Sequence, residues 1–398
     1  MLKLNSDDSF NFELLRVLAH TTYGGADISE CLIAAQEIVP GDFESWYEVW
    51  YRRAERVLSQ AKDLKNPVSI RDAMFRAATY SRAADFFLHG NWDDPRIDSL
   101  WKRQTECFDA AIATLDNPGY RKLVKADGFN VPIIVFPAGK VGDDKKRPTI
   151  LLGNGMDGSM GEMYHMHGVA ALERGYNVVV YDGPGQPSVR REQGLGFIHN
   201  WEAVVTPVVD FLETLPFVDA GKIGLVGYSM GGYLAARAAA FEHRLAAVFQ
   251  IDGLYDFTRT PIFQPENGLG RFGFGDDLEG TQALLNNPKV PAGLRWVLGQ
   301  GLWAFKVRTR SEYLEKARLL SLANGIAEQI QCPVLVGDAA NDMFFLGQPQ
   351  MMVEALGEKA TLVTLTDEDG AGDHCHFGAA RHTNRIMYDW FEEKVVKV

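Results

Sequence analysis

The sequence predicts an α/β fold, with a mostly parallel sheet wrapped by helices, behind an all-helical N-terminal region. Three observations support this prediction. Before residue 115 the chain has helical segments and no strand-like alternation. After residue 119 short apolar strands alternate with helices, which is the pattern of a parallel sheet. One apolar run ends in a Gly-x-Ser-x-Gly motif and continues into an Ala-rich stretch. At 398 residues the chain has room for a large core and a second module.

The N-terminal region, residues 1–118, is predicted to be a helical domain. A helix over residues 43–64 places apolar residues from Trp46 to Ala61 at spacings of three and four. Two further helices are predicted over residues 70–88 and 96–114, each introduced by a proline. Most aromatic side chains here occur at helical spacing and are expected in the core, although a few facing a cleft would suit an aromatic substrate.

Residues 119–398 are predicted to form the α/β core. Its helices are expected near residues 202–214, 233–242 and 381–395, and its strands at residues 120–126, 131–136, 148–152, 176–181, 222–227, 247–251, 332–337 and 360–366. An insertion, residues 253–330, separates the sixth and seventh strands, and its part from 291 to 323 is predicted to be helical. Because parallel sheets bind ligands at the carboxyl ends of their strands, we expect this insertion to roof a pocket together with the N-terminal helices.

The Gly-x-Ser-x-Gly motif consists of Gly227, Ser229 and Gly231. A serine on a sharp strand-to-helix turn is held in a strained conformation, and glycines two residues away on either side leave room for it. We therefore predict that Ser229 is a nucleophile. The backbone N–H of Met230, at the start of the next helix, would point to the oxyanion that forms during acyl transfer.

A serine nucleophile needs a base, and the base needs an acid to orient it. In this kind of fold the expected chain order is serine, acid, histidine. His374 is the predicted base because it follows a Gly-rich loop after the last strand, with His376 and His382 as alternatives. Asp342 is favoured as the acid over Asp338, because an acid too close to the strand end could not turn toward the histidine.

The second oxyanion donor is expected in the Gly-rich loop over residues 153–159. Glycines let a backbone N–H approach a reacting oxygen, so the N–H of Met156 is the main candidate and that of Asp157 the alternative. The side chains of Asp157, Tyr228 and Glu162 are candidates for the substrate pocket.

Composition and motifs argue against several other classes of protein. The net charge is −12 and the basic residues are scattered, so neither nucleic acid nor an anionic membrane is an expected partner. Four cysteines lie far apart, and neither a secretory signal nor a run of about 18 apolar residues occurs, which favours free thiols and a cytoplasmic location.

No metal is expected, because adjacent residues in the run His374–His376 cannot readily converge on one centre. Residues 183–186 lack the third glycine and the opening helix of a dinucleotide fingerprint, so no cofactor is expected.

Four segments together resemble the α/β-hydrolases that carry an N-terminal helical cap: residues 153–159, 227–232, 341–349 and 373–375. This family includes 2,6-dihydroxypseudooxynicotine hydrolase, fungal hydrolases that shorten polyketide pigment precursors, and the fermentation-respiration switch proteins. The resemblance implies the same triad of Ser229, Asp342 and His374, dimers built partly through the cap, and no metal or organic cofactor. In the nicotine-pathway member the oxyanion loop has a Gly-Gly pair followed by an acid, whereas here it has Gly-Asn-Gly.

Several members of this family cleave a carbon–carbon bond beside a carbonyl. The resemblance therefore implies a serine hydrolase that cleaves an acyl bond of a small molecule, with a ketone C–C bond in an aromatic or polyketide-like substrate favoured. An esterase, thioesterase or lactone-forming acyltransferase is the alternative within enzymes. A non-catalytic regulatory binding protein is the alternative of another class, but the switch-protein branch lacks a full triad, whereas this sequence keeps all three residues.

Overall fold

A computed structural model describes residues 2–140, 142–264 and 268–397. Its N-terminal region contains the helices α1 (Asp8–Ala19), α2 (Ile28–Glu37), α3 (Phe43–Ala61), α4 (Pro67–Asp85) and α5 (Pro95–Ile112). Each begins after an Asp or Asn whose side chain accepts hydrogen bonds from backbone N–H groups of the first turn, which defines where the helix starts. The three helices predicted individually are present, with small differences at their ends.

The sheet has eight strands in the described residues, in the order β1-β2-β4-β3-β5-β6-β7-β8. The strands are β1 (Tyr120–Lys125), β2 (Asn130–Phe136), β3 (Arg147–Gly153), β4 (Asn177–Tyr181), β5 (Val218–Tyr228), β6 (Ala247–Ile251), β7 (Val334–Ala339) and β8 (Ala360–Leu365). The β1–β2 and β2–β4 pairings are antiparallel, and all other pairings are parallel. The predicted α/β fold with a mostly parallel sheet is confirmed.

Helices cover both faces of the sheet. On one face, Leu151 packs into a core shared with α9 (Glu202–Glu213) and α10 (Gly231–Ala239). On the other face, its neighbours Ile150 and Leu152 pack into a core shared with α7 (Val169–Glu173) and α15 (Ala380–Phe391). The second core continues into the N-terminal helices, so the helical region is joined to the sheet by buried apolar side chains.

Three helical segments of the core were not predicted from the sequence. They are α6 (Met160–Met163), which runs through a π-turn into α7, and the helices α8 (Pro187–Glu192) and α14 (Gln348–Leu356). The expectation that no helix opens after residues 183–186 is therefore wrong. Pro187 occupies the first position of α8, where its fixed φ and missing N–H favour a helix start.

The insertion between β6 and β7 contains α11 (Leu278–Asn286), α12 (Ala292–Phe305) and α13 (Arg310–Ala317), with short 3-10 turns at Phe257–Arg259, Pro261–Phe263, Leu269–Phe272 and Ala327–Gln329. The helical prediction for residues 291–323 is only partly correct. Lys306 has a left-handed backbone with φ 55° and separates α12 from α13, and the helix ends at Ala317.

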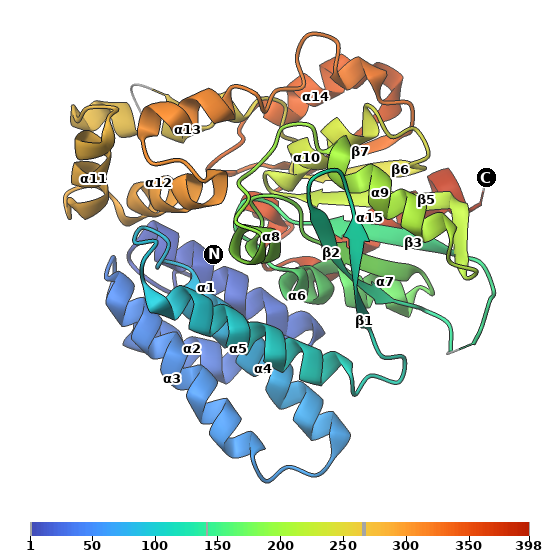
Figure 1. Cartoon of the computed structure of the whole chain (residues 1–398), viewed down its shortest axis with the longest axis horizontal. Coiled ribbons are helices and arrows are strands. Elements are labelled where there is room, and N and C mark those ends of the chain that lie inside the picture. The colour runs from blue at the N-terminus through green and yellow to red at the C-terminus, as the bar shows by residue number, and fades with distance from the viewer. Residues whose placement is uncertain (1, 141, 265–267, 398) are drawn as a thin grey trace.

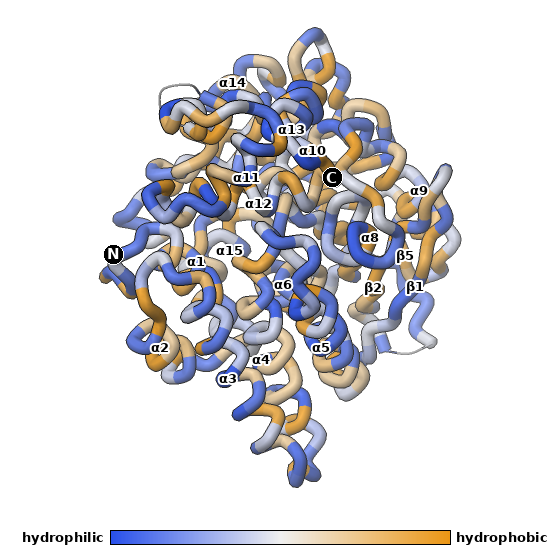
Figure 2. The backbone as a smooth tube through the Cα atoms, turned by 60° about the vertical axis from the view of Figure 1, so that its left-hand side comes forward, coloured by the Kyte–Doolittle hydropathy of each residue, from blue (hydrophilic) through white to orange (hydrophobic). Residues whose placement is uncertain are grey.

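The insertion and the N-terminal helices lie on the same side of the molecule. Figure 1 shows α11–α13 above α1–α5, with the sheet to the right of both groups. Along the N-terminal helices, hydrophilic and hydrophobic residues are interspersed, as expected for helices with one buried face (Figure 2). None of the helices in the described ranges is long and apolar enough to cross a membrane.

Candidate active site

Ser229 lies on the tight turn between β5 and α10. Its φ of 57° is in the left-handed region, and its backbone N–H donates to the carbonyl of Ile251 at the end of β6. The flanking glycines are required by close backbone contacts. A Cβ at Gly227 would lie 1.9 Å from the carbonyl oxygen of Gly231, and a Cβ at Gly231 would lie 2.6 Å from that of Asn154. The turn therefore has the strained geometry that the motif predicts.

His374 connects Ser229 with Asp342. Its Nε2 lies 2.9 Å from Ser229 Oγ, and its Nδ1 lies 2.9 Å from Asp342 Oδ2. Asp342 follows β7 and His374 follows β8, so neighbouring parallel strands bring the two side chains to one edge of the sheet. Asp342 also accepts hydrogen bonds from the backbone N–H groups of Phe344 and Phe345, which hold its carboxylate in place.

A second carboxylate, missed in the sequence, lies beside the same histidine. Asp252 Oδ2 is 3.3 Å from His374 Nδ1 and accepts the backbone N–H of Cys375 at 2.8 Å. Its other oxygen, Oδ1, is 3.1 Å from His376 Nε2. Asp252 directly follows β6, and this position at the carboxyl end of a parallel strand is the signal that could have identified it.

The alternative bases and acid lie away from Ser229. His376 Nδ1 hydrogen-bonds the carbonyl of Ala371, and its Nε2 faces Asp252. His382 lies on α15 and lines a separate open hollow. Asp338 is the last but one residue of β7, and its carboxylate accepts hydrogen bonds from Gln350 and Thr364. The geometry thus brings Ser229, His374 and Asp342 together and leaves these three out.

Burial and charge shift the ionisation of the histidine and both carboxylates. Burial by itself would lower the pKa of His374, but the carboxylate of Asp342 and the hydrogen bonds to Asp252 and Asp342 raise this pKa well above its ordinary value. Burial raises the pKa of Asp342 to about 6. For Asp252, burial is outweighed by the neighbouring His376 and His374, which lower the pKa. The arrangement favours a positive imidazole once it has taken a proton from the serine.

A cavity of about 330 Å³ opens onto Ser229 and His374. Its walls are mostly apolar. Their aromatic residues include Phe12 and Phe86 from the N-terminal helices, Phe257 and Trp296 from the insertion, and Phe344 and Phe345 from the loop after Asp342. Most aromatic residues of the N-terminal region, such as Trp46 and Trp50, are buried in its core instead. An apolar cavity with a few polar groups is the usual form of a small-molecule site.

Both predicted oxyanion donors line this cavity. Met230 is the residue before the first turn of α10, and Met156 lies in the loop after β3. Within the described part of the chain, neither backbone N–H donates a hydrogen bond. Gly155 packs directly against the nucleophile turn, since a Cβ there would lie 2.7 Å from the carbonyl oxygen of Tyr228 and 2.9 Å from Cβ of Ser229. The loop therefore approaches Ser229 as closely as backbone atoms allow.

The three candidate pocket residues are placed differently. Tyr228 and Asp157 line the cavity, and the Tyr228 hydroxyl donates to the carbonyl of Cys375. Glu162 does not line it, so this expectation is wrong. Its side chain is buried behind the cavity wall and pairs with Arg16, whose Nη2 lies 2.8 Å from Glu162 Oε2. Glu162 is on α6 and Arg16 is on α1, so this ion pair lies at the contact between the core and the N-terminal helices.

One group of potential metal ligands coincides with the site. Ligand atoms of Asp252, His374 and Cys375 lie within 4.8 Å of one another in the described residues. His374 and Cys375 therefore bring their ligand atoms close together although they are adjacent in the chain, contrary to the expectation, and the backbone of Cys375 is left-handed here, with φ 57°. Burial raises the pKa of the Cys375 thiol to about 12, and a protonated thiol is a poor ligand.

The fold and the site together define an α/β-hydrolase. The model of the alpha/beta hydrolase family matches residues 150–383, and this chain belongs to that family. It is 31% identical over 404 residues to the hydrolase LUC6 of a Fusarium species, covering 96% of both chains. It is also 31% identical over 422 residues to the 20-hydroxy-prefusarin hydrolase FUS2 of Gibberella moniliformis, covering 98% of both chains. The chain is thus a hydrolase and an enzyme.

Solved structures share the fold. The 2,6-dihydroxy-pseudo-oxynicotine hydrolase superposes with a TM-score of 0.68 over 95% of this chain and 96% of its own, at 23% sequence identity. AbyA5 superposes with a TM-score of 0.64 over 92% of this chain and 94% of its own, at 16% identity. The similarity extends through the N-terminal helices, and it confirms the resemblance to α/β-hydrolases with a helical region before the core.

Proposed function

We propose that this enzyme is a serine hydrolase that cleaves an acyl bond, and that its preferred substrate is an aromatic or polyketide-like small molecule with a C–C bond beside a ketone. One observation carries the proposal: His374 lies 2.9 Å from Ser229 Oγ through Nε2 and 2.9 Å from Asp342 Oδ2 through Nδ1. This is the arrangement in which an imidazole removes a serine proton and an acid orients the imidazole.

In the proposed reaction, Ser229 Oγ attacks the substrate carbonyl while His374 takes its proton. The N–H groups of Met230 and Met156 stabilise the resulting oxyanion. When the C–C bond breaks, its electron pair leaves on carbon as an enolate or phenol-type carbanion, which receives the proton from His374. Water, activated by the same histidine, then hydrolyses the acyl-enzyme and regenerates Ser229.

The substrate class is supported by the apolar, aromatic-lined cavity and by the relatives. FUS2 is named for 20-hydroxy-prefusarin and the structural neighbour for 2,6-dihydroxy-pseudo-oxynicotine, and both names describe oxygenated organic molecules. We further propose that residues 1–118 act as a cap and residues 253–330 as a lid over the core of residues 119–398, since both contribute cavity walls. A homodimer is a further part of the proposal, which light scattering would test.

The nucleophile assignment is tested with a fluorophosphonate probe and the variant Ser229→Ala. The wild-type protein should be labelled at Ser229, and the variant should lose both labelling and turnover, with kcat reduced about 10⁴-fold or more. Near-wild-type turnover by the variant would remove the assignment. A folded wild-type protein that is not labelled would favour a regulatory binding role.

Substrate chemistry is tested with two compounds on the wild-type enzyme. Cleavage of an aromatic β-diketone such as benzoylacetone to acetophenone and acetate, or to benzoate and acetone, is expected. Turnover of p-nitrophenyl acetate without any diketone cleavage would favour an esterase, thioesterase or acyltransferase with the same triad.

A further inference from the structure

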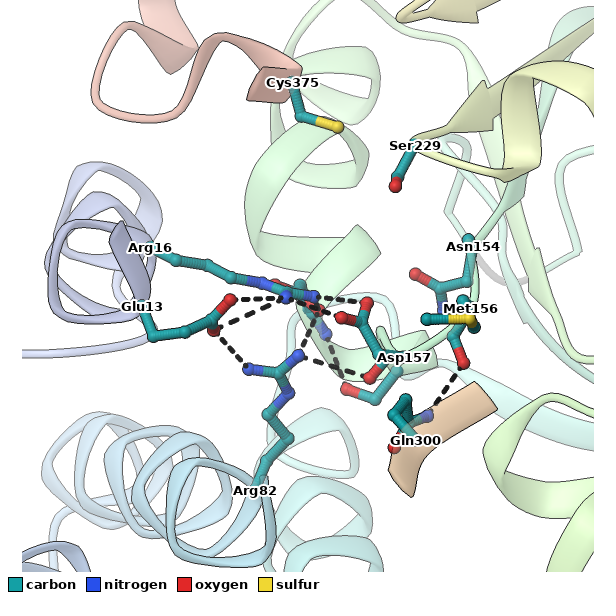
Figure 3. A network of polar contacts seen from close by, with 12 residues as sticks. Glu13, Arg16, Arg82, Asn154, Met156, Asp157, Ser229, Gln300 and Cys375 are labelled. Carbon is teal, nitrogen blue, oxygen red and sulfur yellow. Dashed lines mark hydrogen bonds and ion pairs between the residues drawn. The ribbon is translucent and has the colours of Figure 1, made fainter. Parts of the chain in front are cut away.

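A buried ion cluster forms part of the cavity wall, away from the nucleophile. It consists of Glu13 and Arg16 on α1, Arg82 on α4, Asp157 in the loop after β3 and Glu162 on α6. Figure 3 shows the two arginines reaching from the N-terminal helices toward Asp157, with Ser229 above. Glu13, Arg16 and Asp157 line the cavity that also contains Ser229, so polar groups of this cluster face the substrate space.

The charged groups of the cluster differ in how closely their partners approach them. Arg16 binds Glu162 in bidentate fashion, with its Nε 2.5 Å from Oε1 and its Nη2 2.8 Å from Oε2. Arg82 donates to the backbone carbonyl of Asp157 at 3.2 Å and lies 3.4 Å from Glu162. Two carboxyl groups have only long contacts: Glu13, at 3.4 and 3.5 Å from Arg16 and 3.8 Å from Arg82, and Asp157, at 3.3 and 3.4 Å from Arg16. These two carboxyl groups therefore have hydrogen-bonding capacity left for a ligand, and both line the cavity.

The charges of the cluster favour Glu13 as the protonated one of these two carboxyl groups. Two guanidinium groups face three carboxyl groups, so the cluster is neutral when one carboxyl is protonated. Burial raises the pKa of Glu13 to about 7, although Arg16 and Arg82 oppose this and Asp157 and Glu162 add to it. Burial would also raise the pKa of Glu162, but Arg16 and Arg82 keep it well below its ordinary value. His20, which contacts Glu162, has a pKa lowered by burial. Glu13 is thus the carboxyl group whose protonation the cluster favours, and below about pH 7 it can donate a hydrogen bond.

We propose that Glu13 determines substrate specificity by donating a hydrogen bond from its carboxyl to a carbonyl oxygen that is remote from the bond being cleaved. This inference rests on the proposed function and narrows its substrate class to apolar molecules with a second keto group. Most of the surrounding wall is apolar, with residues such as Phe12, Phe86 and Trp296, so one buried hydrogen bond would discriminate strongly.

The test measures binding, not turnover, and so is independent of the nucleophile. Ligands are 4-phenyl-2-butanone, its apolar match butylbenzene, and the matched cation 4-phenyl-2-butylamine, titrated by calorimetry into wild-type protein, Glu13→Leu and Glu13→Gln. The leucine variant should bind the ketone about 10-fold more weakly and butylbenzene unchanged. Glu13→Leu removes one of the three carboxyl groups of the cluster. Two guanidinium groups then face two carboxylates, so the cluster has no net charge.

The pH dependence of the affinity for the ketone is a second test. It uses Glu13→Gln, a substitution of nearly the same shape that should leave the fold unchanged. A protonated carboxyl donates and a carboxylate cannot, so wild-type affinity for the ketone should fall as the pH rises from 6 to 8. Glu13→Gln donates at every pH, so its affinity for the ketone should stay constant from pH 6 to 8, with His374 and Asp342 unchanged in this variant. Equal ketone affinity in wild type and Glu13→Leu, no ketone binding at all, or tighter binding of the amine would overturn the proposal. If the wild-type protein binds the ketone as expected but is not labelled by the fluorophosphonate probe, only the assignment of Ser229 as the nucleophile is rejected.

Discussion

At the scale of single residues, the catalytic proposal depends on two carboxylates that compete for one imidazole. His374 Nδ1 is 2.9 Å from Asp342 and 3.3 Å from Asp252. Asp252 has a further partner in the backbone N–H of Cys375, whereas Asp342 is held by two N–H groups of its own loop. These contacts favour Asp342 as the orienting acid and give Asp252 a positioning role for the segment that carries His374.

Asp342→Asn should lower kcat about 10³- to 10⁴-fold, because an amide no longer stabilises the imidazolium or selects its tautomer. Asp252→Asn should lower kcat about 10-fold, because a neutral amide weakens the contacts to Cys375, His374 and His376 that position the segment. Steady-state kinetics on one ester substrate compares the two variants directly. If Asp252→Asn proves the more damaging, the acid assignment moves to Asp252.

Glu13 also makes folding stability depend on pH. Its pKa is raised from 4.5 to about 7 in the folded protein, so the folded state binds this proton more tightly than the unfolded chain. The resulting stability is complete below about pH 4.5 and is lost as the pH rises through about 7. Relative to Glu13→Gln, the unfolding free energy of the wild type should therefore fall by about 3 kcal/mol between these limits. Denaturant titrations at several pH values measure this difference, and parallel curves would contradict it.

At the scale of elements, helix α12 of the insertion holds the loop that carries Met156, the proposed oxyanion donor. Gln300 Nε2 donates to the carbonyl of Met156 at 3.0 Å, and Figure 3 shows this contact next to Asn154 and Asp157. Gln300 is 2% exposed, so nothing in the solvent can replace its hydrogen bond. The position of the Met156 N–H therefore depends on an element that the sequence places more than 140 residues away.

Gln300→Leu should lower kcat about 10-fold with a small change in KM, because the loss of an oriented oxyanion donor affects the transition state most. The matched control is Gln329→Leu, which makes the same chemical change at an exposed position, where the side chain donates a hydrogen bond to the carbonyl of Gly325. A change in KM alone would indicate that α12 shapes the substrate pocket and not the oxyanion site.

At the scale of the whole molecule, the cavity exists because three separate regions meet. Trp296 of α12 stacks on Phe86, the residue that follows α4, with ring centroids 4.8 Å apart. Asp85 on α4 pairs with Arg191 on α8 at 2.6 Å, which ties the N-terminal helices to the core. Cavity size is therefore set by contacts between the N-terminal region, the insertion and the core.

Trp296→Ala should enlarge the cavity and shift the acyl-chain preference. Wild-type kcat/KM should fall from p-nitrophenyl butanoate to the decanoate because the cavity of about 330 Å³ limits chain length. The variant should raise the decanoate-to-butanoate ratio about 10-fold, as expected when buried apolar contact with a longer chain becomes possible. Trp101→Ala, at a position that does not line this cavity, serves as the control. An unchanged ratio would indicate that the acyl chain of the substrate does not bind next to Trp296.

The sequence alone determined the strands, the main N-terminal helices and the strained serine turn, because each depends on short-range properties: hydrophobic period, helix-capping side chains, and glycines beside Ser229. Chain order also indicated Asp342 and His374. Tertiary structure decided the rest. Asp252 beside His374, the burial of Glu162 behind the wall and the approach of Glu13 to the cavity all join segments far apart in the chain. Such contacts depend on how elements pack, and packing is set by the summed burial of many side chains, which no local pattern encodes.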